Sequence, residues 1–437
     1  MLRLLTWSTS ALLLLFNLRR LAFLLAAAYD LLRPRLRQPE SGLDLCHVLI
    51  LVPLRNEVRS LPGLFTSLLT LDYPPPLLTI GLIDDGSTDG SGQLMDEFAS
   101  AHPHVVVLHN STSLGKANAL NAGLRQWPQG DLVMVYDADA RPQPDSLRQI
   151  VAAFDDPLVA GAGGLIRPRN GLATPSATYS AIERLVHQQV TLRAKDRLDL
   201  RPAILGSHCA YRRSDLQAAG GFPGGALLED SQLTVDFARS GRRTRFLPCA
   251  LATDHVPETL RGYWRQHVRW GRGFHEVAEK QARAAGQISG FSEETGDRRA
   301  ETGDRRAETG DRSAEAGDRR AEAGDRSALV VRLELWLFAL GYLDRLALMM
   351  ACGLLVQKRA TRARSSEGGL LAAIASTTLL LPYAQIMLAF AAERASLSWW
   401  LRLPLVPFFF LIDIAAALWS TVLSLARRPR VWQQTER

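Results

Sequence analysis

The sequence predicts an α/β domain built on a mostly parallel, doubly wound sheet, with membrane helices before and after it. Two observations lead to this fold class. Between residues 48 and 273, short apolar runs alternate with helical patterns, which is typical of such a sheet. Long apolar stretches flank this region on both sides, and about 20 apolar residues are enough for a helix to cross a bilayer.

The N-terminal segment, residues 1–36, is predicted to be a membrane anchor. Its apolar run extends from about Ala11 to Leu32 and holds Arg19 and Arg20 in its middle. A signal peptide would place its positive charges before the apolar run and small residues at its end, and this segment does neither cleanly. A membrane helix fits if the arginines reach toward the polar surface. An amphipathic helix on the membrane surface is the alternative.

The central domain is expected at residues 47–280. Its predicted strands are residues 47–52, 77–83, 105–108 and 131–136, and the helical patterns between them are residues 61–71, 90–100 and 116–126. In such sheets, ligands bind beyond the carboxyl ends of the strands. Two pairs of aspartates, Asp84 with Asp85 and Asp137 with Asp139, directly follow predicted strands, so a binding site is expected there.

A tandem repeat separates this domain from the C-terminal apolar stretches. From Glu294 to Ala328 the unit E-(T/A)-G-D-R-(R/S)-A occurs five times. No position of the unit holds a large apolar residue, so a coiled coil is excluded. We expect residues 281–328 to form a disordered or partly helical linker, and a recent expansion without function is the alternative.

Three apolar stretches follow the repeat. Residues 370–391 and 403–426 are predicted transmembrane helices. Residues 329–356 carry several charges and are predicted to form an interfacial or transmembrane helix. If this stretch is interfacial, the basic runs at 358–364 and 427–430 both stay on the cytoplasmic side, as the positive-inside rule favours.

Charge and cysteine content narrow the class of protein. The formal net charge is +7, but the basic residues gather beside apolar stretches instead of forming one patch. That placement indicates contact with membrane lipids, and no nucleic acid is expected as a partner. The four cysteines are far apart and lack CxxC spacing, so neither a zinc site nor a disulfide framework is predicted.

Polar loops follow the first two predicted strands. Pro53 ends the first strand, and the loop after it carries Glu57. Asp84 and Asp85 end the second strand and precede Gly86, which permits a tight turn. A carboxylate at a strand end can accept hydrogen bonds from a nucleobase or from ribose hydroxyls. A structural role in the turn and in capping the next helix is compatible with that function.

Lys116 and the later aspartate pair predict a site for a diphosphate. Lys116 opens a predicted helix, where free N–H groups and the helix dipole favour an anion. Asp137 and Asp139 end a strand, and residues i and i+2 of a strand point to the same side. Their carboxylates repel each other unless a cation joins them, and Mg²⁺ or Mn²⁺ shared with a diphosphate would supply that cation.

Two further segments complete the predicted site. Asp230 lies at the start of a helix, where it can act as a general base or as a helix cap. Gln266, Arg269 and Trp270 are spaced i, i+3 and i+4, so they share one helix face. Arg269 can bind a diphosphate through a bidentate contact, and Trp270 offers a flat surface on which a sugar can stack.

In this order, the four landmarks resemble the family 2 glycosyltransferases, in particular the membrane-bound branch with cellulose, chitin and hyaluronan synthases. The landmarks are Asp84-Asp85, Asp137-Ala138-Asp139, Glu229-Asp230 and the QxxRW run Gln266 to Trp270. The resemblance covers residues 48–273 and implies the GT-A fold, which is Rossmann-like. One departure is Leu228, which stands where the family commonly has threonine before its Glu-Asp pair.

The resemblance also implies roles for the landmark residues. Glu57, Lys116 and the Asp84-Asp85 pair would bind the nucleotide-sugar, and Asp137 would mainly hold the nucleotide. Asp139, with help from Asp137, would hold the metal ion, and Asp230 would be the catalytic base. Gln266, Arg269 and Trp270 would contact the diphosphate and the acceptor. His208 lies in a segment similar to the acceptor pocket of the family, although a structural histidine is an equally good interpretation.

The sequence therefore predicts an inverting glycosyltransferase of the hexosyltransferase type in the inner cell membrane, with its catalytic domain in the cytoplasm. The expected donor is a UDP-sugar, and the expected acceptor is a glycan, as in polysaccharide synthesis, or a lipid-linked molecule. Transfer of a single sugar to a lipid or polyprenyl phosphate is one alternative. A non-catalytic membrane scaffold is another, and the loss of a landmark carboxylate would indicate it.

Overall fold

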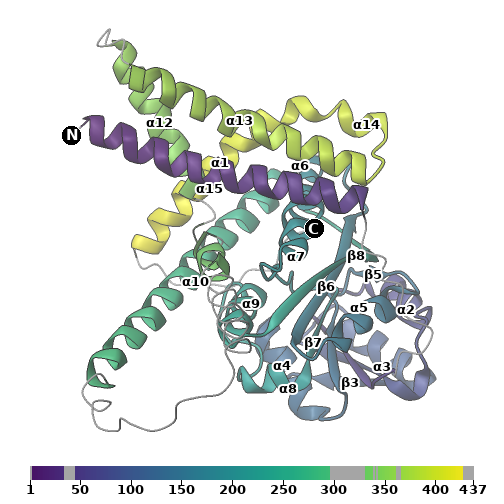
Figure 1. Ribbon diagram of the computed structural model, residues 1–437. Coiled ribbons are helices and arrows are strands. Elements are labelled where there is room, and N and C mark those ends of the chain that lie inside the picture. The colour runs from purple at the N-terminus through teal and green to yellow at the C-terminus, as the bar shows by residue number, and fades with distance from the viewer. Residues whose placement is uncertain are drawn as a thin grey trace.

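The computed structural model describes residues 2–33, 45–295, 330–337, 340, 343–360 and 366–426. One sheet of eight strands forms the centre of the domain, in the order β3-β2-β1-β4-β7-β6-β8-β5 (Figure 1). The strands are β1 Val48–Leu54, β2 Leu78–Asp84, β3 Val105–His109, β4 Leu132–Val135, β5 Arg141–Pro142, β6 Val159–Pro168, β7 Cys209–Arg212 and β8 Arg243–Asp254.

The first half of the sheet is parallel, as predicted. Strands β3, β2, β1 and β4 run in the same direction. Strand β7 is antiparallel to both of its neighbours, and β6 and β8 are again parallel. The four predicted strands correspond to β1 to β4, and the sheet is mixed but mostly parallel. The predicted α/β fold class is confirmed.

Both faces of the sheet are covered because its strands are apolar on both sides. In β1, Ile50 and Val52 pack against α2, α3 and α5, whereas Leu49 and Leu51 pack against α4, α8 and α9. These helices are α2 Leu61–Leu69, α3 Ser91–Ala101, α4 Lys116–Gln126, α5 Ser146–Val151, α8 Arg213–Ala218 and α9 Glu229–Arg239. The arrangement leaves the carboxyl edge of the parallel strands for the loops that carry the aspartates.

A second group of helices lies between the sheet and the apolar helices. One continuous rod consists of α6 Pro175–Val186, the π-helical turn η3 His187–Leu192 and α7 Arg193–Arg197. The side chain of Thr174 caps its start by accepting a hydrogen bond from the backbone of Ala177 at 3.1 Å. Helix α10 extends over Leu260–Thr295, beyond the domain end expected at residue 280, in a sequence without proline.

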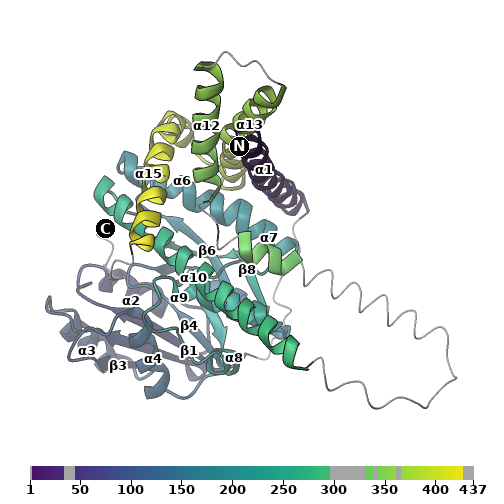
Figure 2. The same ribbon diagram turned by 90° about the vertical axis from the view of Figure 1, so that its left-hand side faces the viewer.

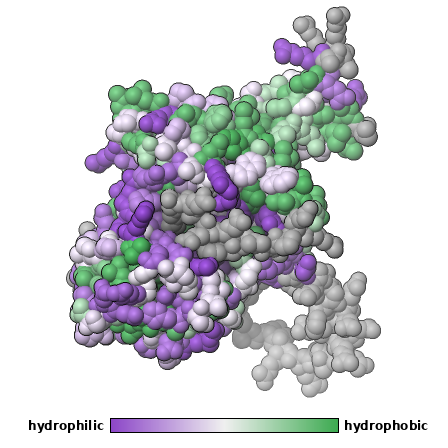
Figure 3. All heavy atoms as spheres, turned by 180° about the vertical axis from the view of Figure 1, so that it is seen from behind, coloured by the Kyte–Doolittle hydropathy of each residue, from purple (hydrophilic) through white to green (hydrophobic). Residues whose placement is uncertain are grey.

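In the part of the chain that the structure describes, three helical segments are long and apolar enough to cross a membrane. They are α1 Leu2–Leu32, α13 Ser366–Ala392 and the segment Leu397–Leu425, which contains α14 Leu397–Trp400, the turn η4 Leu403–Leu405 and α15 Val406–Leu425. They lie together on one side of the sheet domain (Figure 2). Hydrophobic residues cover much of this part of the surface, while the sheet domain is mainly hydrophilic (Figure 3).

The charged stretch 329–356 is described only in part. Its described part contains a helical segment at residues 330–337 and helix α12, Leu343–Ala360, and α12 is not among the three candidate spans. Leu348 and Ala351 of α12 pack in one apolar cluster with Leu13 of α1 and Leu371 of α13. Of the predicted linker, residues 296–328 lie outside the described residues.

Candidate active site

A cavity of about 600 Å³ joins the carboxyl edge of the sheet to the apolar helices. At the sheet end it is lined by Asp85, Lys116, Asp137 and Asp230. Its other end reaches helices α1, α13 and α15, where apolar side chains such as Phe410 form the wall. The predicted site and the membrane helices therefore share one continuous space.

The two neighbouring aspartates after β2 face different surroundings. Asp84 is buried and binds the turn after the strand, accepting a hydrogen bond from the backbone of Ser87 at 2.9 Å. Asp85 lines the cavity and accepts hydrogen bonds from the backbone N–H groups of Leu114 and Gly115, at 2.8 and 3.0 Å. Asp85 therefore fixes the loop that leads into Lys116, and it is the member of the pair that faces the site.

Lys116 lies among the carboxylates of the site. Its Nζ atom is 2.7 Å from Oδ1 of Asp137, 2.8 Å from the carbonyl oxygen of Gly206 and 3.9 Å from Glu229. Burial works against the charged form, but Asp137, Glu229 and Asp230 outweigh it and raise the pKa of Lys116. The lysine therefore stays protonated and supplies positive charge where the sequence predicts a diphosphate.

Asp137 and Asp139 lie in a turn and not on one face of a strand. Strand β4 ends at Val135, and the N–H of Ala140 donates to the carbonyl of Asp137 at 3.0 Å. Asp137 lines the cavity, whereas Asp139 is buried and accepts a hydrogen bond from the backbone of His255 at 3.1 Å. The assumption that strand geometry places both carboxylates on one side does not apply, because the chain turns before them.

These residues still fit a hard divalent cation. Asp137 and Asp139 offer carboxylate oxygens, which Mg²⁺ and Mn²⁺ prefer. His255 follows β8, and its backbone N–H donates the hydrogen bond to Asp139. The side chain of His255 therefore begins next to this carboxylate. Glu57, the acidic residue predicted in the first loop, also lines the cavity, and its carboxylate is held by the hydroxyl of Ser60 at 2.8 Å.

Asp230 combines burial with access to the cavity. It lies in the first turn of α9, one residue after the helix begins, so it is not the N-cap. Burial and the neighbouring Glu229 raise the pKa of Asp230 to about 7, although Lys116 and Arg269 favour its charged form. Gly206 passes so close that a Cβ atom there would lie 2.8 Å from Oδ2 of Asp230. This glycine therefore makes room for the carboxylate.

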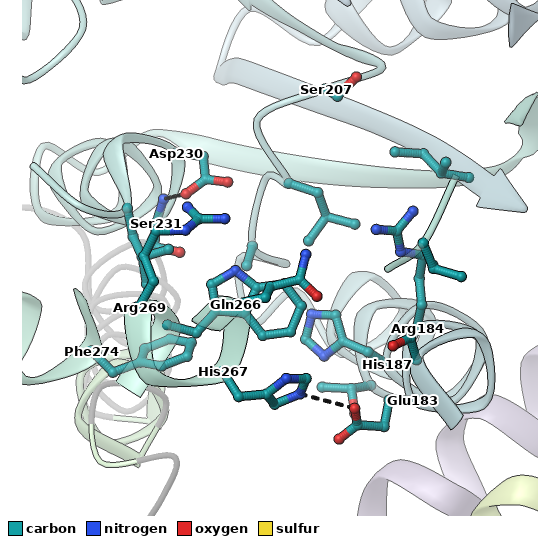
Figure 4. A pocket seen from close by; sticks show the side chains of 18 of the residues that line it. Glu183, Arg184, His187, Ser207, Asp230, Ser231, Gln266, His267, Arg269 and Phe274 are labelled. Carbon is teal, nitrogen blue, oxygen red and sulfur yellow. Dashed lines mark hydrogen bonds and ion pairs between the residues drawn. The ribbon is translucent and has the colours of Figure 1, made fainter. Parts of the chain in front are cut away.

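The residues of the QxxRW run lie on the side of α10 that faces the cavity. Gln266, Arg269 and Trp270 of α10 all line the cavity, and Gln266 and Arg269 project into it near Asp230 (Figure 4). The positive charge of Arg269 stabilises the charged form of Asp230. The helix therefore brings a guanidinium group, an amide and an indole next to the predicted base.

His267 of the same run belongs to a cluster that the sequence did not reveal. Its Nε2 atom is 2.9 Å from Glu183 of α6 and 3.6 Å from Asp413 of α15 (Figure 4). The hydroxyl of Tyr263 lies within hydrogen-bonding distance of both carboxylates and can donate its one hydrogen to either, and Arg345 is 3.1 Å from Asp413. The ligand atoms of the three acid and histidine groups lie within 4.8 Å of one another, a spacing that could hold a metal ion.

Physical chemistry favours a structural role for this cluster. Arg345 and the hydroxyl of Tyr263 already compensate Asp413, so a metal ion is not needed to balance its charge. His208 is structural as well, because it is buried, bonds the carbonyl of Ala250 at 3.0 Å and stacks on Tyr136. The strand-end and turn carboxylates therefore remain the better metal ligands.

Residues 49–220 match the protein family described as glycosyl transferase family 2. This region is a family 2 glycosyltransferase domain. The recognised family and the prediction of a glycosyltransferase are confirmed at the level of this domain. The family 2 match ends before α9 and α10, so Asp230 and the QxxRW face lie beyond it.

Curated relatives extend the similarity past the family 2 match. A probable glycosyltransferase of Bacillus subtilis, YdaM, is 31% identical over 245 residues, which cover 55% of this chain and 58% of the relative. The poly-beta-1,6-N-acetyl-D-glucosamine synthase of Staphylococcus epidermidis is 30% identical over 226 residues, which cover 51% of this chain and 53% of the relative. The similarity thus spans little more than half the length of these relatives.

A solved structure matches the whole chain in fold. The mannosyltransferase PcManGT from Pyrobaculum calidifontis, solved in complex with GDP-Man and Mn²⁺, aligns with a TM-score of 0.62. The alignment covers 98% of this chain and 100% of PcManGT at 21% identity. The family 2 domain therefore has the GT-A fold expected from the sequence.

Proposed function

We propose that the protein transfers a sugar from a UDP-sugar to a hydroxyl group of an acceptor at the membrane surface, with inversion at the sugar carbon. The observation that carries this proposal is the position of Asp230. Its carboxylate faces a cavity that also holds Lys116 and Arg269, and its pKa of about 7 suits a general base at neutral pH. In the proposed reaction Asp230 takes the proton from the attacking hydroxyl.

The donor would bind at the sheet end of the cavity. Asp84 and Asp85 order the loops that would hold the nucleoside, and Glu57 lies in the neighbouring loop, while Lys116 and Arg269 would face the diphosphate. Asp137 and Asp139 would hold Mg²⁺ or Mn²⁺, which when bound supplies positive charge to the departing diphosphate. A solved neighbour in fold was crystallised with Mn²⁺ and a nucleotide-sugar, which supports this assignment.

The base assignment has a direct test. Replacing Asp230 by asparagine keeps the shape of the side chain but removes its basicity. Sugar transfer should then fall by about 10² to 10⁴, because a positioned base contributes that much. UDP binding, measured by calorimetry on the same variant, should persist and shows that the donor site is intact. Full transfer activity in Asp230→Asn would falsify the assignment.

Two acceptor classes remain to be separated, and each has its own support. A polysaccharide product is supported by the similarity to poly-beta-1,6-N-acetyl-D-glucosamine synthases. Transfer of one sugar to a lipid-linked acceptor is supported by the cavity, which continues between the membrane helices. Incubation with a panel of radiolabelled nucleotide-sugars distinguishes them, since one class gives a ladder of products and the other a single added sugar.

A non-catalytic scaffold is disfavoured because every predicted carboxylate is present in the chain. Nucleotide release from UDP-sugars by the purified protein tests this alternative. We also propose that the domain faces the cytoplasm of the inner membrane, because this orientation, with an interfacial 329–356 stretch, keeps the basic runs at 358–364 and 427–430 on the cytoplasmic side, as the positive-inside rule favours. Cysteine labelling at position 360 examines the proposed topology, and labelling from outside the cell would contradict an interfacial 329–356 stretch.

A further inference from the structure

The π-helical turn at His187–Leu192 directs a histidine into the cavity. Within the turn, Gln188 bonds the backbone of Ile166 at 2.7 and 2.8 Å, and Gln189 bonds Glu393. His187 instead lines the cavity, where it lies between Gln266 and Glu183 (Figure 4). Turns of this type inside α-helices are frequent at functional sites.

His187 has both ring nitrogens available for a ligand. Among the described residues, no hydrogen bond or ion pair to its imidazole is found. Burial, together with the positive charges of Lys195 and Arg19, lowers the pKa of His187 to about 4. The ring is therefore neutral at physiological pH and can donate one hydrogen bond from its protonated nitrogen.

Two arginines of α1 line the same part of the cavity. Arg19 binds Glu334 through Nε and Nη2, at 2.8 and 2.6 Å, and Lys195 lies 3.0 Å from the same carboxylate. Two basic groups therefore meet at one carboxylate. Arg20 pairs with Asp344 through Nη2, while its Nη1 is buried and has no hydrogen-bond partner in the described part of the chain.

Buried donors without partners are costly, and a ligand commonly satisfies them. Beyond the arginines, the lining includes the apolar side chains of Phe16, Pro382, Ile386 and Phe410, with the polar side chains of Gln385 and Arg345 among them. An anionic head group attached to an apolar chain matches both parts of the wall, because guanidinium groups bind phosphate well.

We propose that the membrane-side end of the cavity, at His187, Arg19 and Arg20, binds the phosphate head group of a lipid-linked acceptor. This inference rests on the proposed function and makes its acceptor class more specific. The acceptor would enter between α1, α13 and α15 and present its hydroxyl toward Asp230, while its lipid stays against the apolar wall.

The test uses two probes that differ only in the phosphate, farnesyl phosphate and farnesol. Binding of each to the detergent-solubilised full chain is measured by native mass spectrometry. The wild type should bind farnesyl phosphate at least about tenfold more tightly than farnesol, as expected for charge-assisted hydrogen bonds. Equal affinity for the two probes would overturn the proposal.

Variants test which residues cause the preference for farnesyl phosphate over farnesol. Arg19→Gln should remove this preference, and the chain should still fold because Lys195 keeps Glu334 paired. His187→Gln should weaken it as well. Arg33→Gln is the matched control, since Arg33 is an exposed arginine just after α1 and does not line the cavity. If Arg19→Gln and His187→Gln both retain the preference, the phosphate does not bind here.

Competition separates the sources of the phosphate. Inorganic phosphate or phosphatidylglycerol, added at the concentration of farnesyl phosphate, should not displace it. Displacement by either would contradict a dedicated acceptor site. UDP-sugar turnover is followed separately. No turnover with any donor, together with phosphate-dependent lipid binding, would refute the proposed function and leave this binding site standing.

Discussion

The Nζ atom of Lys116 lies 2.7 Å from Oδ1 of Asp137, so the predicted nucleotide-binding lysine and the predicted metal-binding aspartate contact each other directly. Three acidic groups, Asp137, Glu229 and Asp230, stabilise the charge of this one lysine. The lysine therefore offsets part of the negative charge of these carboxylates, and it also influences the predicted base, Asp230.

The first prediction concerns the pH dependence of transfer. Asp230 must be deprotonated to act as a base, and its pKa is raised to about 7. The value of kcat/KM should therefore rise with pH through about 7 and fall away on the acidic side. A rate that stays constant down to pH 5 would show that another group is the base.

The second prediction concerns Lys116→Met. The positive charge of Lys116 favours the charged form of Asp230, so its removal should move the acidic limb of the pH profile to higher pH. Transfer should also slow by about 10² to 10³, as for other groups that stabilise developing charge. Lys280→Met is the control, because Lys280 is half-exposed and pairs with Glu276 outside the cavity. An unshifted acidic limb would contradict the coupling.

The third prediction concerns Gly206. A Cβ atom at this position would meet the carboxylate of Asp230, and the backbone φ of +72° also disfavours a side chain. Gly206→Ala should lower the free energy of unfolding by about 1 to 3 kcal/mol and reduce kcat. Gly220→Ala separates the two causes, since Gly220 has φ of +85° but nothing within 4 Å of a Cβ. If both variants lose activity equally, contact with Asp230 is not the reason.

The fourth prediction distinguishes the two candidate metal positions. Asp139→Asn should raise the Mn²⁺ concentration needed for half-maximal transfer by at least about tenfold, because it removes a charged ligand. Glu183→Gln, in the cluster with His267 and Asp413, should leave that concentration unchanged. The opposite pattern would place the metal ion in the cluster and not beside β4.

The fifth prediction concerns the ion pair between Arg345 and Asp413. Asp413 is completely buried, so Arg345→Gln removes one of its two cationic partners and leaves it only His267 and the hydroxyl of Tyr263, which should cost about 3 kcal/mol of stability. The double variant Arg345→Gln with Asp413→Asn should be more stable than the sum of the single changes predicts. Thermal unfolding in detergent measures the stability of both single variants and of the double variant. Stability losses that simply add would argue against direct coupling of the two side chains.

Local pattern was sufficient to predict β1 to β4 and to choose residues that the structure brings to one cavity, among them Asp137, Asp230 and the QxxRW face. Each of these follows from a short run of sequence, such as an apolar strand followed by acidic residues. Local pattern did not decide which of Asp84 and Asp85 faces that cavity. The turn after Val135 was missed, because nothing in the apolar run indicates that the strand ends before Asp137.

Long-range pairs could not be predicted in the same way. Arg19 and Glu334 are 315 residues apart, and His267 meets Asp413 across 146 residues. In the sequence, each of these residues is an isolated polar group in or near an apolar stretch, and nothing nearby indicates its partner. The π-helical turn that exposes His187 also has no local sequence signal, since its residues fit an ordinary α-helix. Tertiary packing, and not local preference, decides these positions.

Helix α10 connects the cavity of the sheet domain directly to the apolar helices. The same helix presents Gln266, Arg269 and Trp270 to the cavity and attaches through Tyr263 and His267 to Asp413 of α15. A fragment that ends after β8 would keep the proposed donor side but lose the wall that faces the proposed acceptor. We therefore expect bilayer thickness and lipid composition to act on turnover through the tilt of α10, whose side chains line the cavity.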